Sequence, residues 1–237
     1  MYHEEALNLL RWLAYAQSPP TLAELVDAAI IDLDEEGSID MGERGGLRGA
    51  LNILFGLVTI EENQSDRAKN HTNTGIFTSD VSTAGPEQSG AMFHSENLTP
   101  DTRVRLAHFS VKEYLESKHV LQSGARQFHL ENATGHRALA QSCLTYLRCY
   151  SFSCQKTSTK QDLETFPVLG YASKSWFYHS TLQCGGKISR EMSLLHLEQV
   201  RDDWLAVHKP DEPWEKHLKG EKGEKGDQVR QYITRVF

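Results

Sequence analysis

Apolar residues recur at helical spacing in three successive runs near the start of the chain, at residues 6–14, 21–30 and 47–58. Apolar positions three or four residues apart place one face of a helix against a core. Thr21 and Glu24 have the spacing of a capping box, and they follow a Ser18-Pro19-Pro20 break. The pattern therefore predicts three short amphipathic helices.

A different pattern follows, in which strand-like segments flank a long polar stretch. Residues 57–60 are rich in β-branched side chains, and residues 102–109 alternate so that Val104, Leu106 and His108 share one face. Residues 61–101 are crowded with Ser, Thr, Asn, Gly and Glu and have no sustained period. We expect a two-stranded hairpin, the wing, with 61–101 as a disordered insertion.

A second capping-box pattern at Ser110 and Glu113 predicts a helix that continues to about His119. The order of three helices, two strands and a further helix is that of a winged helix. We therefore expect a winged-helix domain over residues 1–122.

Strand patterns end after Gly124, and helical runs are predicted at residues 136–147, 166–182 and 190–207. We expect Trp12, Trp176 and Trp204 to pack in cores, and His179 to be structural. The repeat GEKGEKGD from Gly220 is too short and lacks the proline of a collagen helix, so it predicts a charged linker. The fold class is then mainly α, with a helical domain over residues 123–237.

Composition is that of an ordinary globular protein, with 39% hydrophobic and 24% charged residues. A net charge of -7 opposes non-specific attraction to nucleic acid or to anionic membranes. The sequence predicts no secretion signal and no membrane span, which favours a cytoplasmic location. The four cysteines, Cys143, Cys149, Cys154 and Cys184, match no common zinc spacing and are expected to be reduced, structural thiols.

Catalytic motifs are missing from the sequence. It has no phosphate-binding P-loop, no Gly-x-Ser-x-Gly elbow, no HExxH helix and no GxGxxG turn after a strand. We therefore predict that the chain is not an enzyme and that it holds neither a metal nor a cofactor alone.

His108 is the one histidine with a chemically useful place, because it ends the second predicted strand just before Ser110 and the next helix. The N-terminus of a helix attracts anions, and an imidazole donor beside it would complete a phosphate site. The alternative is a histidine that forms a hydrogen bond inside the core.

Five segments resemble fungal NACHT-ankyrin proteins, in the winged helix and helical region that follow the ATPase core. They are ALNLLRWL, TLAELVDAAII, VRLAHFSVKEYL, RALAQSCLTYL and FPVLGYASKSWFYHS. The winged helix of this type is also associated with inositol-deacylase-type proteins. The resemblance covers about residues 5–60 and 103–180, and its most specific block is LAHFSVKEYL.

The resemblance implies that His108, together with Ser110, contacts the phosphate of ADP bound to a NACHT ATPase core. It implies a regulatory module whose partners, in cis or in trans, are that core and downstream repeats. The P-loop, the acidic metal-binding strand and the repeats are absent from the sequence, so any ADP or ATP site would be half a site.

Two other functions compete with this interpretation. A DNA-binding winged helix would need polar side chains on its third helix, where only Arg48 and Asn52 are suitable. An inositol-deacylase-like enzyme would need an activated serine, but Ser110 and Ser142 are better explained by their places in helices. The sequence does not predict a role for residues 185–237.

Overall fold

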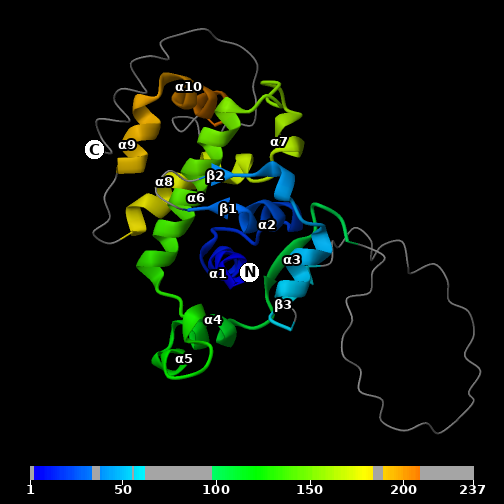
Figure 1. Cartoon of the computed structure of the whole chain (residues 1–237), viewed down its shortest axis with the longest axis vertical. Coiled ribbons are helices and arrows are strands. Elements are labelled where there is room, and N and C mark those ends of the chain that lie inside the picture. Colours follow the sequence, from blue (N-terminus) through cyan, green and yellow to red (C-terminus); the bar gives the residue numbers. More distant parts are fainter. Residues whose placement is uncertain (1–2, 34–37, 55, 62–97, 184–188, 209–237) are drawn as a thin grey trace, which may run out of the picture. The chain divides into compact units, whose positions relative to one another are not determined.

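The computed structural model describes residues 3–33, 38–54, 56–61, 98–183 and 189–208, and it is mainly α-helical (Figure 1), as expected. It divides into two compact units. The first comprises Met1–Ala29 and Glu43–Leu130, and the second comprises Ile30–Gly42 and Glu131–Phe237. The second unit thus draws on two separate parts of the sequence.

The first unit begins with the helices α1 (His3–Tyr15), α2 (Leu22–Ala29) and α3 (Leu47–Ile53). The capping box at the start of α2 is confirmed. The Thr21 amide donates to Glu24 Oε2 over 2.7 Å, and the Glu24 amide donates to Thr21 Oγ1 over 3.2 Å. These two bonds satisfy amides that a helix leaves without an internal partner.

The third predicted helix ends earlier than its apolar pattern suggests. After Ile53 the chain turns at Gly56, whose φ of 78° lies in the region that favours glycine. Val58, assigned from the pattern to the face of that helix, instead begins strand β3 (Val58–Glu61). Asn52 is exposed.

Strand β3 pairs antiparallel with β4 (Arg103–Leu106), from Val58 opposite Leu106 to Glu61 opposite Arg103. On β4, Val104 is buried while Arg103 and Arg105 are exposed. The segment between α1 and α2 extends this pairing through an isolated bridge from Thr21 to Arg103. The predicted insertion begins at Glu61, the last residue of β3, and its residues 62–97 lie outside the described residues.

The predicted single helix after β4 is interrupted. It forms α4 (Phe109–Glu116) and α5 (Lys118–Leu121), because Ser117 takes an extended conformation with ψ of 157°. A 3-10 turn at Arg126–Phe128 follows.

The core of the first unit is assembled from the inner faces of α1, α2, α3 and β4. Its most buried side chains include Leu9, Trp12, Leu22, Leu25, Leu51, Leu54 and Val104, and Val120 and Leu130 from later in the unit add to them. Asp27 is also buried on α2, and both of its carboxylate oxygens accept bonds from Arg44, at 2.6 and 2.8 Å. This paired geometry offsets the cost of burying the charge.

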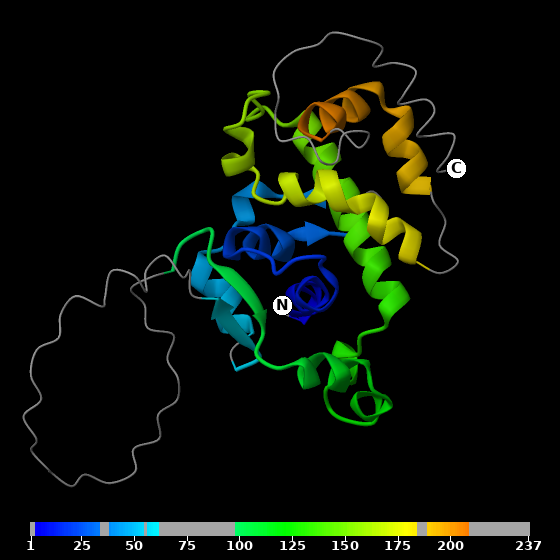
Figure 2. The same ribbon diagram turned by 180° about the vertical axis from the view of Figure 1, so that it is seen from behind.

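The second unit is built on α6 (Asn132–Phe152) and α8 (Leu169–Leu182), which pack side by side (Figure 2). The other helices are α7 (Asp162–Thr165), α9 (Ser189–His196) and α10 (Glu198–Val207). The predicted helices at 166–182 and 190–207 therefore have corrected bounds, and the second is broken at Leu197, which is extended with ψ of 100°.

The acidic connection after α2 contains two short strands that the pattern does not predict. Strand β1 (Ile31–Asp32) pairs antiparallel with β2 (Ser38–Ile39), and both contact α6. Ile31 is buried while Asp32 is exposed. A two-residue strand is too short to give a detectable alternation.

The core of the second unit lies between α6, α8 and α10. Its buried side chains include Leu139, Tyr146, Leu147, Phe166, Trp176, Val200 and Trp204. The expectation that the three tryptophans pack in cores is confirmed. Of the helices in the described ranges, none has the length and apolarity needed to cross a bilayer. The predicted linker from Gly220 lies outside the described residues.

Candidate functional site

His108 stands at the junction of β4 and α4. The pairing with β3 reaches one residue past β4, because the Ala107 amide donates to the Leu57 carbonyl over 2.9 Å. His108 then has extended backbone, with φ of -149° and ψ of 147°, and is the N-cap of α4. The strand pair therefore fixes where the imidazole meets the helix.

The imidazole is held by two contacts at its Nδ1 atom. The Ser110 amide donates to Nδ1 over 3.2 Å, and Ser110 Oγ lies 2.8 Å from the same atom. An amide can only donate, so Nδ1 is the acceptor and the neutral ring carries its proton on Nε2. The Nε2–H group is thus a defined donor.

This geometry corrects the predicted capping box at Ser110 and Glu113. Helix α4 begins at Phe109 and its cap is His108, so Ser110 lies inside the first turn. The physical reason is that Nδ1 of histidine can accept from an amide two residues ahead, as the oxygen of a usual cap residue does.

His108 lies at the surface of the first unit. His108, Phe109 and Ser110 are all exposed, and 68% of the Phe109 side chain is accessible. The rings of His108 and Phe109 lie 4.3 Å apart. The alternative of a histidine inside the core is therefore wrong.

Helix α4 is fixed to the end of α1. Lys112 Nζ donates to the Ala14 carbonyl over 2.9 Å and lies 4.7 Å from the centre of the Tyr15 ring. The Tyr15 hydroxyl in turn donates to Glu116 Oε1 over 2.8 Å. A lysine beside the last carbonyls of a helix also suits their partial negative charge.

The arrangement at His108 suits a single anionic group. It combines an exposed Nε2–H donor with the N-terminus of α4, where aligned backbone dipoles favour negative charge. Ser110 is placed to orient the imidazole, since its hydroxyl and its amide both approach Nδ1.

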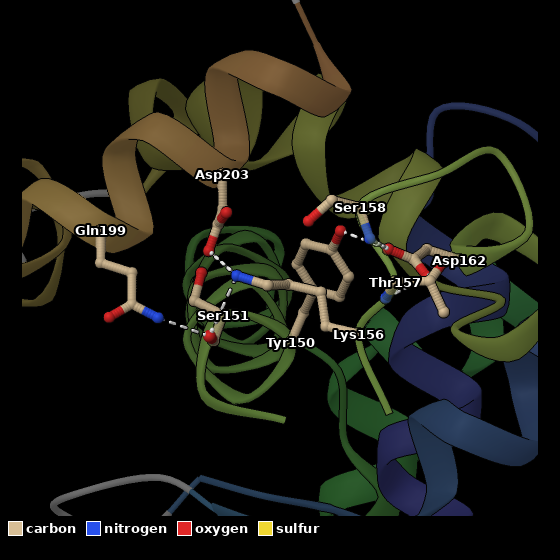
Figure 3. A network of polar contacts seen from close by, with 8 residues as sticks. All are labelled: Tyr150, Ser151, Lys156, Thr157, Ser158, Asp162, Gln199 and Asp203. Carbon is tan, nitrogen blue, oxygen red and sulfur yellow. Dashed lines mark hydrogen bonds and ion pairs between the residues drawn. The ribbon is translucent and has the colours of Figure 1, made fainter. Parts of the chain in front are cut away.

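The second unit contains a polar cluster that the sequence pattern does not predict, around the buried carboxylate of Asp162 (Figure 3). Asp162 accepts from the Tyr150 hydroxyl at 2.7 Å, from the Ser158 amide at 2.8 Å, and from the amide and hydroxyl of Thr157 at 2.9 and 2.6 Å. The only signal for this cluster in the sequence is the run of hydroxyl residues that precedes Asp162.

These bonds decide the protonation of the cluster. Burial raises the pKa of Asp162, but the hydrogen bonds from Thr157, Tyr150 and Ser158 outweigh it and lower the pKa to about 2. Burial and the bond to Asp162 raise the pKa of Tyr150. Near neutral pH the carboxylate stays charged and the phenol neutral, which suits a structural role better than proton transfer.

A neighbouring ion pair joins the loop after α6 to α10. Lys156 Nζ lies 2.7 Å from Asp203 Oδ2 and donates to the Ser151 carbonyl over 3.4 Å (Figure 3). Gln199 Nε2 donates to the same carbonyl over 2.8 Å. Together with Asp162, these contacts order the loop that follows α6.

Three cysteines lie in the described part of the second unit, all as free thiols. Cys143 is buried, Cys149 is half-buried and Cys154 is exposed. Burial raises the pKa of the Cys149 thiol, which disfavours the reactive thiolate. Cys184 lies outside the described residues. Within the described ranges, no group of three or more His, Cys, Asp or Glu side chains is placed to hold a metal ion.

Comparison with known proteins gives one distant relative to report. The chain is 26% identical over 215 residues to the azaphilone pigments biosynthesis cluster protein L of Monascus ruber. The aligned part is 89% of this chain, which spans 39% of the length of that relative. No family model matches the chain. No solved structure matches it significantly.

Proposed function

We propose that this chain is a non-catalytic regulatory module of a NACHT-type signalling ATPase, with a winged helix as its first unit. The observation that carries the proposal is the His108 imidazole, exposed at the start of α4 with its Nε2–H as donor. A surface histidine held in this way suits contact with a phosphate of a bound nucleotide.

The order of elements in the first unit supports the winged-helix part of the proposal. Helices α1, α2 and α3 precede the antiparallel pair β3 and β4. An isolated bridge from Thr21 to Arg103 places the α1–α2 connection beside β4. Such a small sheet beside three helices is the arrangement that a winged helix requires.

ADP, held mainly by the ATPase core, is the nucleotide that we propose His108 senses. The donor set fits a phosphate, because His108 supplies a donor at a helix N-terminus and Ser110 fixes its orientation. Bound ADP would supply the anionic oxygens for this contact. The chain alone would hold half a site, and its partners would be the ATPase core and downstream repeats, in cis or in trans.

Regulation would follow from a difference in contacts between two states. A nucleotide shifts an equilibrium only by its differential affinity for the two arrangements. Contact between ADP and His108 would favour the closed, inactive arrangement, and exchange for ATP would release it. The name of the Monascus ruber relative specifies a pigment biosynthesis cluster and no reaction, so it does not favour an enzymatic alternative.

The test uses the gene product that contains the ATPase core, or its complex with that core, and measures ADP affinity by calorimetry. We expect His108→Leu to weaken ADP binding at least about tenfold, because a hydrogen bond to a charged group is lost. Basal oligomerisation should rise in the same variant. His119→Leu, which removes another exposed histidine of the first unit, is the control.

A second variant separates the phosphate contact from the helix cap. Aspartate is a strong N-cap residue, so His108→Asp should preserve α4 while removing the donor and repelling a phosphate. ADP affinity should fall without loss of thermal stability. Unchanged ADP affinity together with unchanged oligomerisation in both His108 variants would refute the proposal.

A further inference from the structure

Two buried histidines face each other between α6 and α8 in the second unit. His136 Nδ1 lies 2.8 Å from His179 Nδ1, and His179 Nε2 lies 2.7 Å from the Tyr171 hydroxyl. His179 is 0% exposed, His136 5% and Tyr171 8%. The three side chains form a buried, hydrogen-bonded chain across the main helix pair of this unit.

The short nitrogen–nitrogen distance excludes a closed pair in which both rings are fully protonated. One Nδ1 must donate and the other must accept, because two N–H groups cannot point at each other at this distance. If Tyr171 donates to His179 Nε2, then His179 Nδ1–H donates to His136 Nδ1. The reverse order also satisfies both contacts of His179, and in each order at least one of the two rings stays neutral.

The groups around His179 do not favour a positive charge on it. Its two ring nitrogens contact a second imidazole and a phenol, and the Tyr178 ring packs edge-on at 5.2 Å. Burial, and then the neighbouring His136, lower the pKa of His179 from 6.5 to about 3. Arg137, next to His136 on α6, adds a positive charge to the same turn.

Acidic groups on the packed elements have other partners. Glu191 of α9 accepts from Ser180 Oγ at 3.0 Å and from Gln183 Nε2 at 2.6 Å. Asp162 of α7 and Asp203 of α10 bind Tyr150 and Lys156, near the far end of α6. Asp32 of β1 is exposed.

We propose that the His136–His179–Tyr171 chain is an acid-sensitive latch, in which the closed α6–α8 pair excludes protons that the opened pair takes up. Well above pH 6.5 His179 is neutral in both states, so a change of pH there has no effect. As the pH falls through 6.5, His179 gains a proton only in the opened state, and closure weakens continuously towards pH 3.

The size of the effect follows from this proton uptake. His179 has an ordinary pKa in the opened state and a pKa near 3 in the closed state. Lowering the pH from 7.5 to 5.5 therefore raises the opening constant about tenfold. Carboxylates with ordinary pKa values change their charge little over this range.

The experiment is hydrogen exchange of the full chain at pH 7.5 and pH 5.5, with mass spectrometry of α6 and α8 peptides. After correction for intrinsic exchange rates, we expect the opening constant to rise about tenfold at the lower pH. His196→Gln, which removes an exposed histidine of α9, should keep this ratio. His179→Gln should reduce it to within about twofold of unity, and an unchanged ratio in that variant would overturn the proposal.

A direct titration covers the case in which His179→Gln fails to fold. In the wild-type chain, the carbon-13 NMR signal of the His179 ring should not shift between pH 7.5 and pH 5.5, whereas an exposed imidazole should titrate. Titration of His179 with an ordinary midpoint would equally rule out the latch.

Discussion

Asp162 is a buried carboxylate whose hydrogen-bond donors all lie within twelve residues of it in the sequence. The sequence nevertheless does not predict the cluster, because Thr, Ser and Asp together are equally typical of an exposed loop. What distinguishes this cluster from an exposed loop is the burial of Asp162. That burial results from tertiary packing, which a local sequence pattern does not contain. The place of His108 at the start of α4 is predicted by the sequence because its signal, the end of a strand beside a helix start, is local.

Asp162→Asn should destabilise the second unit by about 3 kcal/mol, since the amide group of asparagine cannot accept the bonds that one carboxylate oxygen receives. Urea unfolding at pH 7, followed by tryptophan fluorescence, measures the change. Asp202→Asn on α10 is the matched control, because 63% of the Asp202 side chain is exposed. Equal losses in the two variants would contradict the structural role of Asp162.

The stabilising effect of Asp162 should disappear in acid. Its folded pKa of about 2 lies below the ordinary value of 3.8, so the contribution is complete well above pH 3.8 and is lost as the pH falls towards 2. The difference in unfolding free energy between wild type and Asp162→Asn should shrink by about 1.5 kcal/mol between pH 5 and pH 2.5. A difference that stays constant with pH would show that Asp162 has an ordinary pKa.

The two predicted capping boxes show where local patterns succeed and fail for helices. The pattern at Thr21 and Glu24 is confirmed, while the equivalent pattern at Ser110 and Glu113 is wrong because His108 takes the cap. The apolar pattern also does not predict where two of the helices are interrupted. One extended residue, such as Ser117 or Leu197, ends a helix without disturbing the apolar spacing around it.

Alanine substitutions of Glu24 and Glu113 test whether only the first of the two predicted capping boxes stabilises its helix. Glu24→Ala should lower the unfolding free energy of the first unit by about 1 kcal/mol, because the Thr21 amide loses its acceptor. Glu113→Ala should change it by less than about 0.5 kcal/mol, since Glu113 is exposed and is not part of the observed cap. Urea unfolding measures both changes. A comparable loss of unfolding free energy in the two variants would show that Glu113 does cap α4.

The chain passes between its two units more than once, which the apolar pattern of the sequence does not predict. The pattern predicts contiguous domains that meet at residues 122 and 123, whereas the segment Ile30–Gly42 groups with Glu131–Phe237. Contiguity is the natural assumption when strands as short as β1 and β2 leave no periodic signal. The consequence is that a substitution early in the sequence can act on the second unit.

Ile31→Ala tests this assignment, because Ile31 is 2% exposed on β1, which contacts α6. Loss of a buried isoleucine side chain costs about 2–5 kcal/mol. We expect hydrogen-exchange protection to fall in α6 and α8 while α1 and α2 keep theirs. Leu25→Ala, at a fully buried position of α2, should give the opposite distribution. If Ile31→Ala instead lowers protection mainly in α1 and α2, residues 30–42 belong with the first unit, and the second is the contiguous domain that the sequence pattern predicts.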